Sequence, residues 1–555
     1  MKDFNQLLMI FILFLYLILG VFTACDSKEI DKAIVESTPI ISYVSGTDYE
    51  IAKYSNRTCA IRKYRGDEVF LDIPQTLDGY LVTSIEDNAF SECRSLAIVT
   101  LPEDVTSIGD QAFSYCTSLA YINIPSRVTS IGAEAFHNCD SLDRITIPAS
   151  VNSIGDGAFE SCGALENIIV DVENPNYADI RGVLFDKNAK IIHTFPAGKN
   201  SSVYTIPEGI QAIGKKAFSA CKDLRQVNIP DSVTKIGESA FYWCESLTSI
   251  TIPASVCIIG AGAFSSCSSL ENITVDADNS IFGIFDGVLY NKKDKILHTY
   301  PSTKKSVIFI IPEGTISIEE RAFDNCKTIE KIIVPEGLIS IGDEAFLGCN
   351  NLSNIEIPDS VTSIGASAFR WCNLTGDITI PDSVISIGED AFFSCDAMNS
   401  ITIPSSVRFI GEAAFFGCGS LASINVDLNN PTYSDIEGVL FNNATKVLHS
   451  YPGGKKGTSY SIPEETLSIA QNAFDSEYLQ NIVIPEGVTT IGDRAFAGCD
   501  SLMSITFPVS ITAIGGEPLF WSKLEEIKVK EESYSDEYFK KTKYAPLLSY
   551  QVTWL

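Results

Sequence analysis

Sixteen cysteines and four histidines are the residues of this 555-residue chain whose types and spacing could do chemistry. Thirteen of the cysteines recur at one position of a repeating pattern, from Cys93 to Cys499, and three histidines recur at another. Cysteine pairs form disulfides in exported chains, and cysteine together with histidine binds zinc. The sequence therefore raises three possibilities: a disulfide framework, a metal site, or an array of buried, unreactive thiols.

The spacing of the cysteines favours the last possibility. Each repeat contributes one cysteine, and stacked repeats lie about 4.8 Å apart, the distance between neighbouring strands. Successive Cβ atoms at that distance lie beyond the roughly 3.5–4.5 Å that a disulfide requires. The column also lacks the Cys-x-x-Cys pairs of zinc sites. Because free cysteine packs as a small hydrophobic residue, we predict a buried column of free thiols.

His193, His298 and His449 hold the same position in three insertions. His193 and His298 are 105 residues apart, which separates them by on the order of 15 Å or more along a stack of repeats. Ligands of one metal ion lie about 2 Å from it, so we predict a structural role and no metal site. No Ser/His/Asp set, paired carboxylates or phosphate-binding loop stands out. The sequence therefore indicates a non-enzymatic protein without a cofactor.

A repeat of 23 residues, seen clearly at 105–125, positions these side chains. Its anchor is an isoleucine that returns fifteen times between Ile85 and Ile514. The spacing is 23 residues within each block, apart from one of 22, and 59 residues at the three block boundaries. A fixed period of this size is typical of a solenoid, in which each repeat contacts only its neighbours.

The other columns of the repeat, counted from the anchor isoleucine, predict its secondary structure. Phe stands five residues on in fourteen repeats, and Cys stands eight residues on in thirteen. Leu-x-x-Ile-x-Ile alternates as a strand does, and the Pro that usually follows cannot donate to a sheet. Ser-Val-Thr-x-Ile-Gly predicts a second short strand or an extended turn, and Ala-Phe-x-x-Cys predicts one helical turn. Each rung of the solenoid is therefore expected to combine strand, turn and short helix.

Three insertions interrupt the array, over 171–206, 276–311 and 427–462. In each insertion an aspartate replaces the proline of the rung, and two apolar runs follow on either side of a polar turn. That pattern predicts a β-hairpin. We expect each insertion to add a projecting or widened rung between blocks of the solenoid.

The motif Ile-Pro-x-Ser-Val-Thr-x-Ile-Gly-x-x-Ala-Phe-x-x-Cys-x-Ser-Leu resembles the BspA-like leucine-rich repeat family of bacterial surface proteins. The resemblance implies a leucine-rich-repeat-like solenoid over 85–525, between an N-terminal cap at 41–84 and a C-terminal cap at 526–555. It also implies adhesion to host matrix proteins such as fibronectin or fibrinogen, or to other cells. The alternative is a structural, envelope-organising lipoprotein without a host ligand.

The N-terminal residues predict export and a lipid anchor. Residues 1–24 combine Lys2 with a short apolar run, which is typical of a signal peptide. The sequence Phe-Thr-Ala-Cys25 resembles a bacterial lipobox, which implies a lipidated cysteine at the start of the mature protein. Residues 25–40 are polar and predict a tether. Acyl chains on Cys25 would hold the protein on a membrane, at the cell surface or outer membrane.

Composition and surface pattern limit the partners. The net charge is −30, which argues against nucleic acid because its phosphates would be repelled. The outward strand positions are small and polar, whereas three of the four tryptophans share a column seven residues after the anchor. Rings in that column either pack over the turn or form a row of half-exposed anchors for a protein ligand. The candidate binding residues are Tyr115, Trp243, Trp371 and Trp521.

Overall fold

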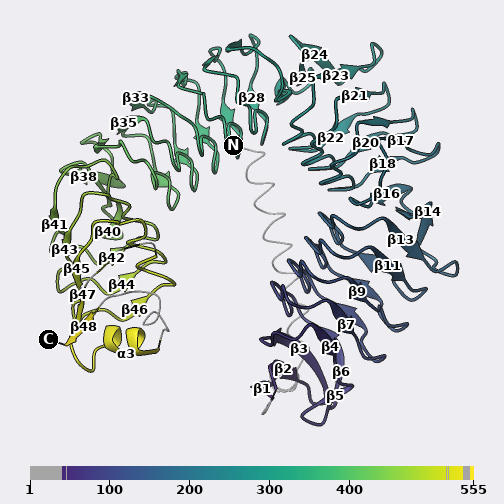
Figure 1. Ribbon diagram of the computed structural model, residues 1–555. Coiled ribbons are helices and arrows are strands. Elements are labelled where there is room, and N and C mark those ends of the chain that lie inside the picture. The colour runs from purple at the N-terminus through teal and green to yellow at the C-terminus, as the bar shows by residue number, and fades with distance from the viewer. Residues whose placement is uncertain are drawn as a thin grey trace, which may run out of the picture. The chain divides into compact units, whose positions relative to one another are not determined.

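The computed structural model describes residues 40–44, 47–520, 522, 524, 526–541 and 551–554 (Figure 1). The chain divides into two compact units. The first contains residues up to 188 together with 193–199, and the second contains 189–192 and the residues from 200 onward. In each unit the predicted solenoid of stacked rungs is confirmed.

One wall of each unit is a ladder of short strands that contain the anchor isoleucine. In the first unit β8 (Ser107–Ile108), β10 (Ser130–Ile131) and β12 (Ser153–Ile154) pair in parallel, with each isoleucine opposite the next. The second unit repeats this ladder in β18 (Ala212–Ile213), β20 (Lys235–Ile236) and β22 (Ile258–Ile259), in β28 (Ser317–Ile318), β30 (Ser340–Ile341), β32 (Ser363–Ile364), β34 (Ser386–Ile387) and β36 (Phe409–Ile410), and in β42 (Ser468–Ile469), β44 (Thr490–Ile491) and β46 (Ala513–Ile514). Of the short strand or extended turn predicted for this segment, the structure has the short strand.

A second wall consists of the strands of the Leu-x-x-Ile-x-Ile motif. Successive residues of these strands point alternately to the core and to solvent. In β21 (Ser249–Ile252), for example, Ile250 and Ile252 are buried while Thr251 is exposed. These strands pair in parallel within six sheets, which are β4 (Phe70–Asp72), β7 (Ile98–Thr100) and β9 (Tyr121–Ile122); β11 (Arg144–Ile147) and β13 (Asn167–Val170); β17 (Val203–Thr205), β19 (Gln226–Asn228), β21 and β23 (Asn272–Val275); β27 (Ile308–Ile310), β29 (Lys331–Ile333) and β31 (Asn354–Ile355); β33 (Gly376–Thr379), β35 (Met398–Ile403) and β37 (Ser423–Val426); and β41 (Ser459–Ser461), β43 (Asn481–Val483), β45 (Ser504–Thr506), β47 (Glu526–Val529) and β48 (Gln551–Trp554).

The third side of each rung is a run of turns, in place of the helical turn predicted for Ala-Phe-x-x-Cys. The amide of Cys116 donates to the carbonyl of Phe113 over 3.2 Å, a bond that spans only three residues. Gln111 and Tyr115 have left-handed φ angles of 54° and 59°, which interrupt a right-handed helix. Hydrogen bonds between rungs also form here, since Phe113 N donates to Ala135 O over 2.8 Å.

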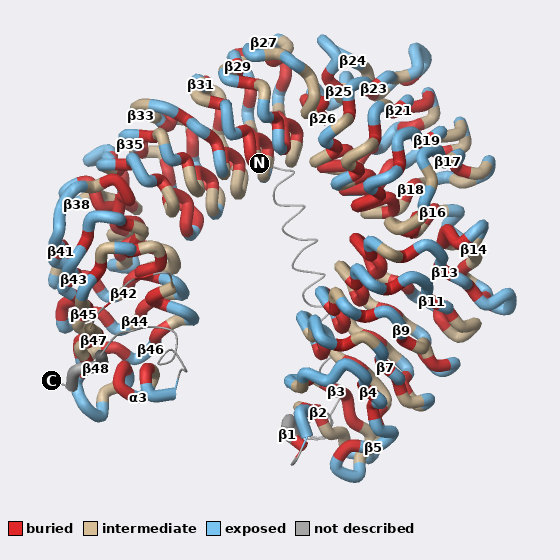
Figure 2. Tube along the Cα trace, in the orientation of Figure 1, coloured by how far each residue is buried: buried red, intermediate tan, exposed pale blue. Residues whose placement is uncertain are grey.

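The phenylalanine five residues after each anchor fills the centre of the core. These rings are at most 3% exposed, and neighbouring rings stack with centroids 4.9–5.9 Å apart. The glycine after the anchor permits this spacing, because a Cβ at Gly365 would lie 2.5 Å from the backbone nitrogen of Asp343 in the preceding rung. Buried segments accordingly recur along the rungs of both units (Figure 2).

The insertions contain the predicted hairpin and one further strand before it. In the second insertion β24 (Phe282–Phe285), β25 (Val288–Asn291) and β26 (Ile296–Thr299) pair antiparallel in that order, and β26 then pairs in parallel with β28. The insertion thereby continues the anchor ladder. The other two insertions contribute β14 (Tyr177–Ile180), β15 (Val183–Asp186) and β16 (Ile191–Thr194), and β38 (Tyr433–Ile436), β39 (Val439–Asn442) and β40 (Val447–Ser450).

The ends of the described chain add strands and a helix. At the start β1 (Ile40–Tyr43), β2 (Tyr49–Lys53) and β3 (Thr58–Tyr64) pair antiparallel, and β3 pairs in parallel with β6 (Tyr80–Ile85), which also pairs with β5 (Thr76–Leu77). Near the other end stands α3 (Tyr534–Lys541), the one helix among the described residues. Its Phe539 packs against Phe507 with ring centroids 5.2 Å apart.

Candidate binding surface

The column seven residues after the anchor lies on the outside of the turns. Tyr115 of the first unit is 42% exposed, and Trp243 and Trp371 of the second unit are 43% and 49% exposed. The rings are therefore half-exposed, and Tyr115 also packs edge-on against His137 of the next rung, with ring centroids 5.2 Å apart. Trp521, the fourth residue predicted for this column, lies outside the described residues.

Backbone conformation makes these aromatic residues unusual. Tyr115, Trp243 and Trp371 have φ angles of 59°, 60° and 61°, in the left-handed region that disfavours bulky side chains. Other rungs place better-suited residues at the same position, including Gly348, Gly417, Gly498, Asn138 and Asn325. Glu92, Ser161 and Ala220 share the left-handed conformation at this position as well, so the conformation belongs to the turn and not to the aromatic ring.

Cations lie beside both exposed indoles. Lys222 Nζ lies 4.6 Å from the ring centroid of Trp243, and the guanidinium carbon of Arg370 lies 4.7 Å from that of Trp371. Arg370 also lies over the ring of Phe393, at 4.0 Å. These cation–π contacts orient the rings at the surface. Tryptophan, phenylalanine and arginine are also among the side chains enriched in protein interfaces.

The outward residues of the second wall form a polar stripe. Their side chains hydrogen-bond along the stack, because Thr251 Oγ1 lies 2.9 Å from Thr274 Oγ1 and Asn228 donates to Thr205 Oγ1 over 2.9 Å. The exposed members are Thr146, Asn228, Thr251, Thr274, Thr379, Thr402 and Asn425, while Asn123 is half-buried. Such a surface offers many hydrogen bonds but little apolar area.

An apolar patch beside the second insertion interrupts this stripe. Its exposed members are Phe285, Ile308 and Ile310 of the insertion and Ile333 of the following rung, which line one hollow. Contiguous apolar surface of this kind often marks an interaction site. Periodicity alone does not reveal the patch, but isoleucine at outward positions where other rungs have Thr or Asn is the signal that would.

The cysteine column lies inside the turns. All thirteen of its members are free thiols, and all except the half-buried Cys93 are buried. Cys349 Sγ donates to the carbonyl of Phe323 over 3.1 Å, and eight further thiols contact the Phe of the preceding rung in the same way. Burial raises the pKa of Cys162 to about 12, which makes its thiol a poor nucleophile at neutral pH. Cys25, the candidate for lipid attachment, lies outside the described residues together with the predicted signal peptide.

The three insertion histidines each contact the anchor ladder. Nε2 of His193, His298 and His449 lies 3.1–3.2 Å from the carbonyl oxygen of the last anchor isoleucine before the insertion. A carbonyl only accepts, so Nε2 carries the hydrogen. Burial lowers the pKa of all three rings and favours the neutral form. Among the described residues no group of three or more His, Cys, Asp or Glu side chains could hold a metal ion.

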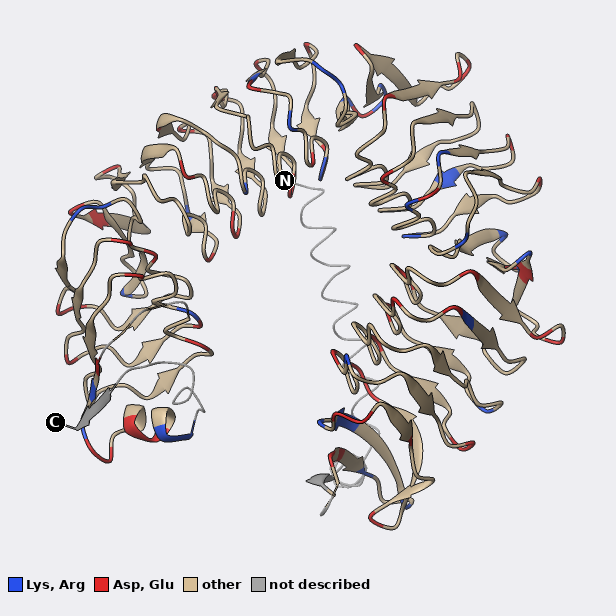
Figure 3. Cartoon of the chain, in the orientation of Figure 1, with Lys and Arg blue, Asp and Glu red and all other residues tan. Residues whose placement is uncertain are grey.

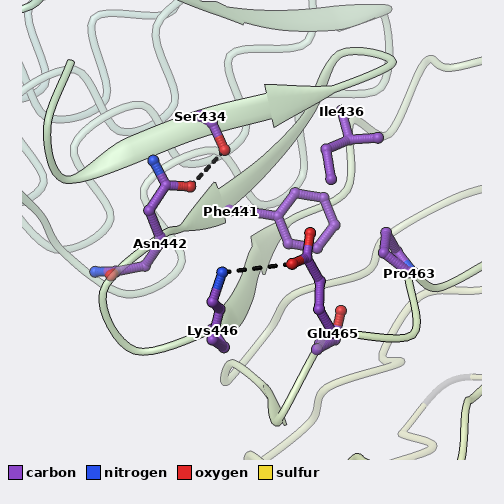
Figure 4. A pocket seen from close by; sticks show the side chains of 9 residues that line it. Ser434, Ile436, Phe441, Asn442, Lys446, Pro463 and Glu465 are labelled. Carbon is purple, nitrogen blue, oxygen red and sulfur yellow. Dashed lines mark hydrogen bonds and ion pairs between the residues drawn. The ribbon is translucent and has the colours of Figure 1, made fainter. Parts of the chain in front are cut away.

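The pocket at the third insertion is too small for an organic substrate. Figure 4 shows its lining, where Lys446 Nζ lies 3.5 Å from Glu465 Oε2 beside the ring of Phe441. The volume is about 30 Å³, far below the roughly 300–1,000 Å³ of ligand pockets.

Acidic residues are spread over the rungs of both units (Figure 3). Several form ion pairs with a neighbouring rung, such as Glu344 with Arg321 at 2.8 Å and Glu517 with Arg494 at 3.1 Å. Ion pairs at the surface contribute little stability. The acidic residues therefore matter mainly through the net charge of −30 that they give the protein. Within the described part of the chain, no helix has the length and apolar character needed to cross a membrane.

A family comparison matches the repeat along most of the chain. The profile described as "BspA type Leucine rich repeat region (6 copies)" matches residues 72–192, 193–308, 298–421, 362–452 and 449–547. The matched segments include all three insertions. No protein of curated function matches the chain at a significant level.

Solved bacterial leucine-rich repeat proteins are also similar. A leucine rich cell surface protein from Faecalibacterium prausnitzii is 33% identical, over 70% of this chain and 96% of that chain, with a TM-score of 0.42. A leucine-rich repeat protein from Eubacterium ventriosum is 27% identical, over 61% and 96%, with a TM-score of 0.43. One from Bacteroides ovatus is 21% identical, over 94% and 98%, with a TM-score of 0.28.

Proposed function

We propose that this chain, which belongs to the BspA-type leucine-rich repeat family, is a non-enzymatic cell-surface protein that binds other proteins. In this proposal the contacts are made by the column of Tyr115, Trp243, Trp371 and Trp521. The supporting observation is the exposure of the three described rings on a backbone that disfavours them. Trp243 and Trp371 belong to the same unit, so one extended partner could contact both rings.

The proposed partners are host matrix proteins, such as fibronectin or fibrinogen, or the surfaces of other cells. Large rings offer much area to desolvate at little loss of side-chain entropy, which is why tryptophan and tyrosine dominate interface hot spots. Nucleic acid is a poor partner, because the net charge is −30 and polyanions would be repelled. The alternative of an envelope-organising protein would need no such exposed anchors.

Anchorage through a lipid on Cys25 is part of the same proposal, with residues 1–24 as the signal peptide and 25–40 as the tether. Its motive is the apolar run that ends in Phe-Thr-Ala-Cys25. A Cys25→Ala variant should lose fatty-acid labelling and should no longer fractionate with membranes. If the variant still fractionates with membranes, the lipid-anchor proposal fails.

The binding proposal is tested with Trp243→Asn, Trp371→Asn and the double variant. Asparagine is chosen because Asn138 and Asn325 hold this position in other rungs, so the backbone accepts it. Affinities for immobilised fibronectin, fibrinogen and intact host cells are measured at one fixed salt concentration. Each substitution should weaken binding by about 1–3 kcal/mol, the loss that follows from truncation of an interface anchor.

The matched control introduces asparagine into the same column where no ring is lost. Ser266→Asn and Ser394→Asn change positions with φ angles of 56° and 53° and should leave affinity unchanged. Unaltered binding by a folded Trp243/Trp371 double variant would exclude the aromatic column as the binding surface. Failure of the unmodified protein to bind any of these ligands would favour the envelope-organising alternative.

A further inference from the structure

The second wall of the solenoid opens between two consecutive rungs of the second unit. Strand β31 pairs with β29 and strand β33 pairs with β35, but among the described residues no strand pairing joins β31 to β33. The opening is local. Thr375 N still donates to Ser353 O over 3.1 Å at its start, and Ile385 N donates to Thr362 O over 2.9 Å beyond its end.

The sequence of the rung explains the opening. Leu374 stands ten residues after the anchor Ile364, where eleven is usual, and Gly376 follows two residues later. Gly376 has a left-handed φ of 82°, and the register between β33 and β35 shifts between Gly376 and Asp377. Such a bulge bends and twists its strand. Here β33 stays paired with the rung after it and separates from the rung before it.

Lost pairing alone does not open the wall. Strands β9 and β11 of the first unit also belong to different sheets, yet their inward residues Ile122 and Ile145 are only 4% and 2% exposed. At the opening, Ile355 and Ile378 hold the equivalent position and are only half-buried. The cleft that results has a volume of about 330 Å³. Its apolar lining includes the half-buried Ile355, Ile357 and Ile378, behind which Phe369 and Phe392 are fully buried.

The chemistry of this cleft matches a polypeptide segment. Its volume lies at the lower end of the roughly 300–1,000 Å³ of ligand pockets. Its two walls are strand edges that face each other without pairing, and another main chain is the best complement to such edges. The half-buried side chains of Ile355 and Ile378 form an apolar floor that suits one large side chain. Glu356, Asp359 and Asp377 contribute carboxylates, and no Lys or Arg stands among the described lining residues.

We propose that the cleft between β31 and β33 binds a short extended peptide segment of a partner protein, with an apolar side chain against Ile355 and Ile378 and a flanking Lys or Arg facing Glu356 and Asp377. The open stretch 354–358 matches a peptide of about five residues, at about 3.3 Å per residue. A second copy of this chain is a poor occupant, because its net charge is −30. The site uses no residue of the aromatic column and goes beyond the function proposed above.

Three labelled synthetic peptides test the proposal by fluorescence polarisation with the full chain. They are Lys-Val-Phe-Val-Lys, its charge-reversed form Glu-Val-Phe-Val-Glu, and the polar form Lys-Ser-Ser-Ser-Lys. Saturable binding is expected for the first peptide, with at least about tenfold weaker binding of the other two, because they lose the charge match or the apolar anchor. Absence of saturable binding of the first peptide at millimolar concentration would overturn the proposal.

A charge reversal in the cleft makes the test specific. In Glu356→Lys/Asp377→Lys the preference should invert, so that the Glu-flanked peptide binds more tightly than the Lys-flanked one. The matched control, Asp143→Lys/Glu166→Lys, reverses two exposed carboxylates next to the paired strands β11 and β13 and should retain the original preference. An unchanged preference in the cleft variant would assign the peptide to another surface and overturn the proposal.

A filled cleft provides a second, independent readout. Ile378→Trp adds bulk at the half-buried floor and should abolish binding of the Lys-flanked peptide, and a urea unfolding curve verifies that the variant is folded. If the Lys-flanked peptide binds the folded Ile378→Trp variant as tightly as the unmodified protein, the cleft is not its binding site. Because the Trp243/Trp371 variant retains every cleft residue, loss of matrix binding without loss of peptide binding, or the reverse, separates this proposal from the proposed function.

Discussion

Two columns on the same turns, the buried phenylalanines and the exposed aromatic residues two positions later, follow opposite rules. Phe369 is fully buried and stacks on Phe346 and Phe392 at 5.2 and 5.3 Å, whereas Trp371 is 49% exposed with a φ of 61°. Phe occupies its column in fourteen of fifteen rungs, while the outer column changes from rung to rung. Packing therefore dictates the residue type inside, whereas the exposed position outside accepts many residue types.

The largest loss of folding stability is expected when one phenylalanine of the buried column is removed. Phe346→Ala removes a ring that stacks on both sides, at 5.0 and 5.2 Å, and should lower the free energy of unfolding by about 3–5 kcal/mol. Urea unfolding followed by circular dichroism measures the change. A loss below about 1 kcal/mol, far under the usual range for a buried ring, would weaken the contrast between the two columns.

The glycine after the anchor tests the spacing that brings the inner rings into contact. In Gly365→Ala the new Cβ would lie 2.5 Å from Asp343 N, so adjacent rungs must shift apart, with a loss of about 1–3 kcal/mol. Gly419→Ala is the matched control, because its Cβ would lie 3.9 Å from Asp396 Oδ1, the nearest atom outside its chain neighbours. Equal melting temperatures for the two variants would show that close approach does not set the stacking distance.

The three insertion histidines are polar residues buried in the core, and their burial makes the stability of the protein depend on pH. Burial lowers the pKa of His298 below its ordinary value near 6.5, and Glu319 opposes part of that shift. The unfolded chain then binds more protons, so the stability present above pH 6.5 is lost as the pH falls below it. The urea midpoint should drop between about pH 7 and pH 5, and His298→Gln, which cannot titrate, should drop less. If the urea midpoint depends on pH in the same way in the unmodified protein and in His298→Gln, burial of His298 does not cause the drop.

The smallest change in folding stability is expected for a substitution in the exposed aromatic column. Trp371→Asn relieves a left-handed conformation that costs a bulky residue roughly 1–2 kcal/mol but loses an exposed contact with Arg370 of about 0.5–1 kcal/mol. Stability should therefore stay unchanged or rise by up to about 1 kcal/mol, as a urea curve would record. If the variant is destabilised by more than that amount, the ring belongs to the core and the distinction between the columns is lost.

Regular spacing made most of the fold predictable from the sequence. The anchor isoleucines, the Phe column and the cysteine column each face the core as their positions indicate, because every rung repeats the same contacts with its neighbours. The turn was harder to predict, since Ala-Phe-x-x-Cys also suits a helix. Its left-handed positions carry residues such as Gln111 and Tyr115, which give no local signal, and its hydrogen bonds join residues of different rungs, as between Phe113 and Ala135.

The surface features depend on relations that a single repeat does not contain. The exposure of Trp243 and Trp371 follows from the shape of the turn, so the sequence left two arrangements open. The cleft beside β33 begins with a visible irregularity, the early Leu374 and the nearby Gly376. Its outcome depends on how the neighbouring strands pack, because the unpaired strands β9 and β11 keep Ile122 and Ile145 buried.

The bonds between rungs have a mechanical consequence. The stacked Phe rings, the amide bonds between turns and the nine thiol bonds to Phe carbonyls link adjacent rungs, so a pull on the two ends of a unit loads these interfaces in series. A chain anchored at one end and attached to a partner along its length would then yield one rung at a time. Release of the 23 residues of one rung adds up to about 80 Å of extended chain, so a tether under load would lengthen in steps before it detached.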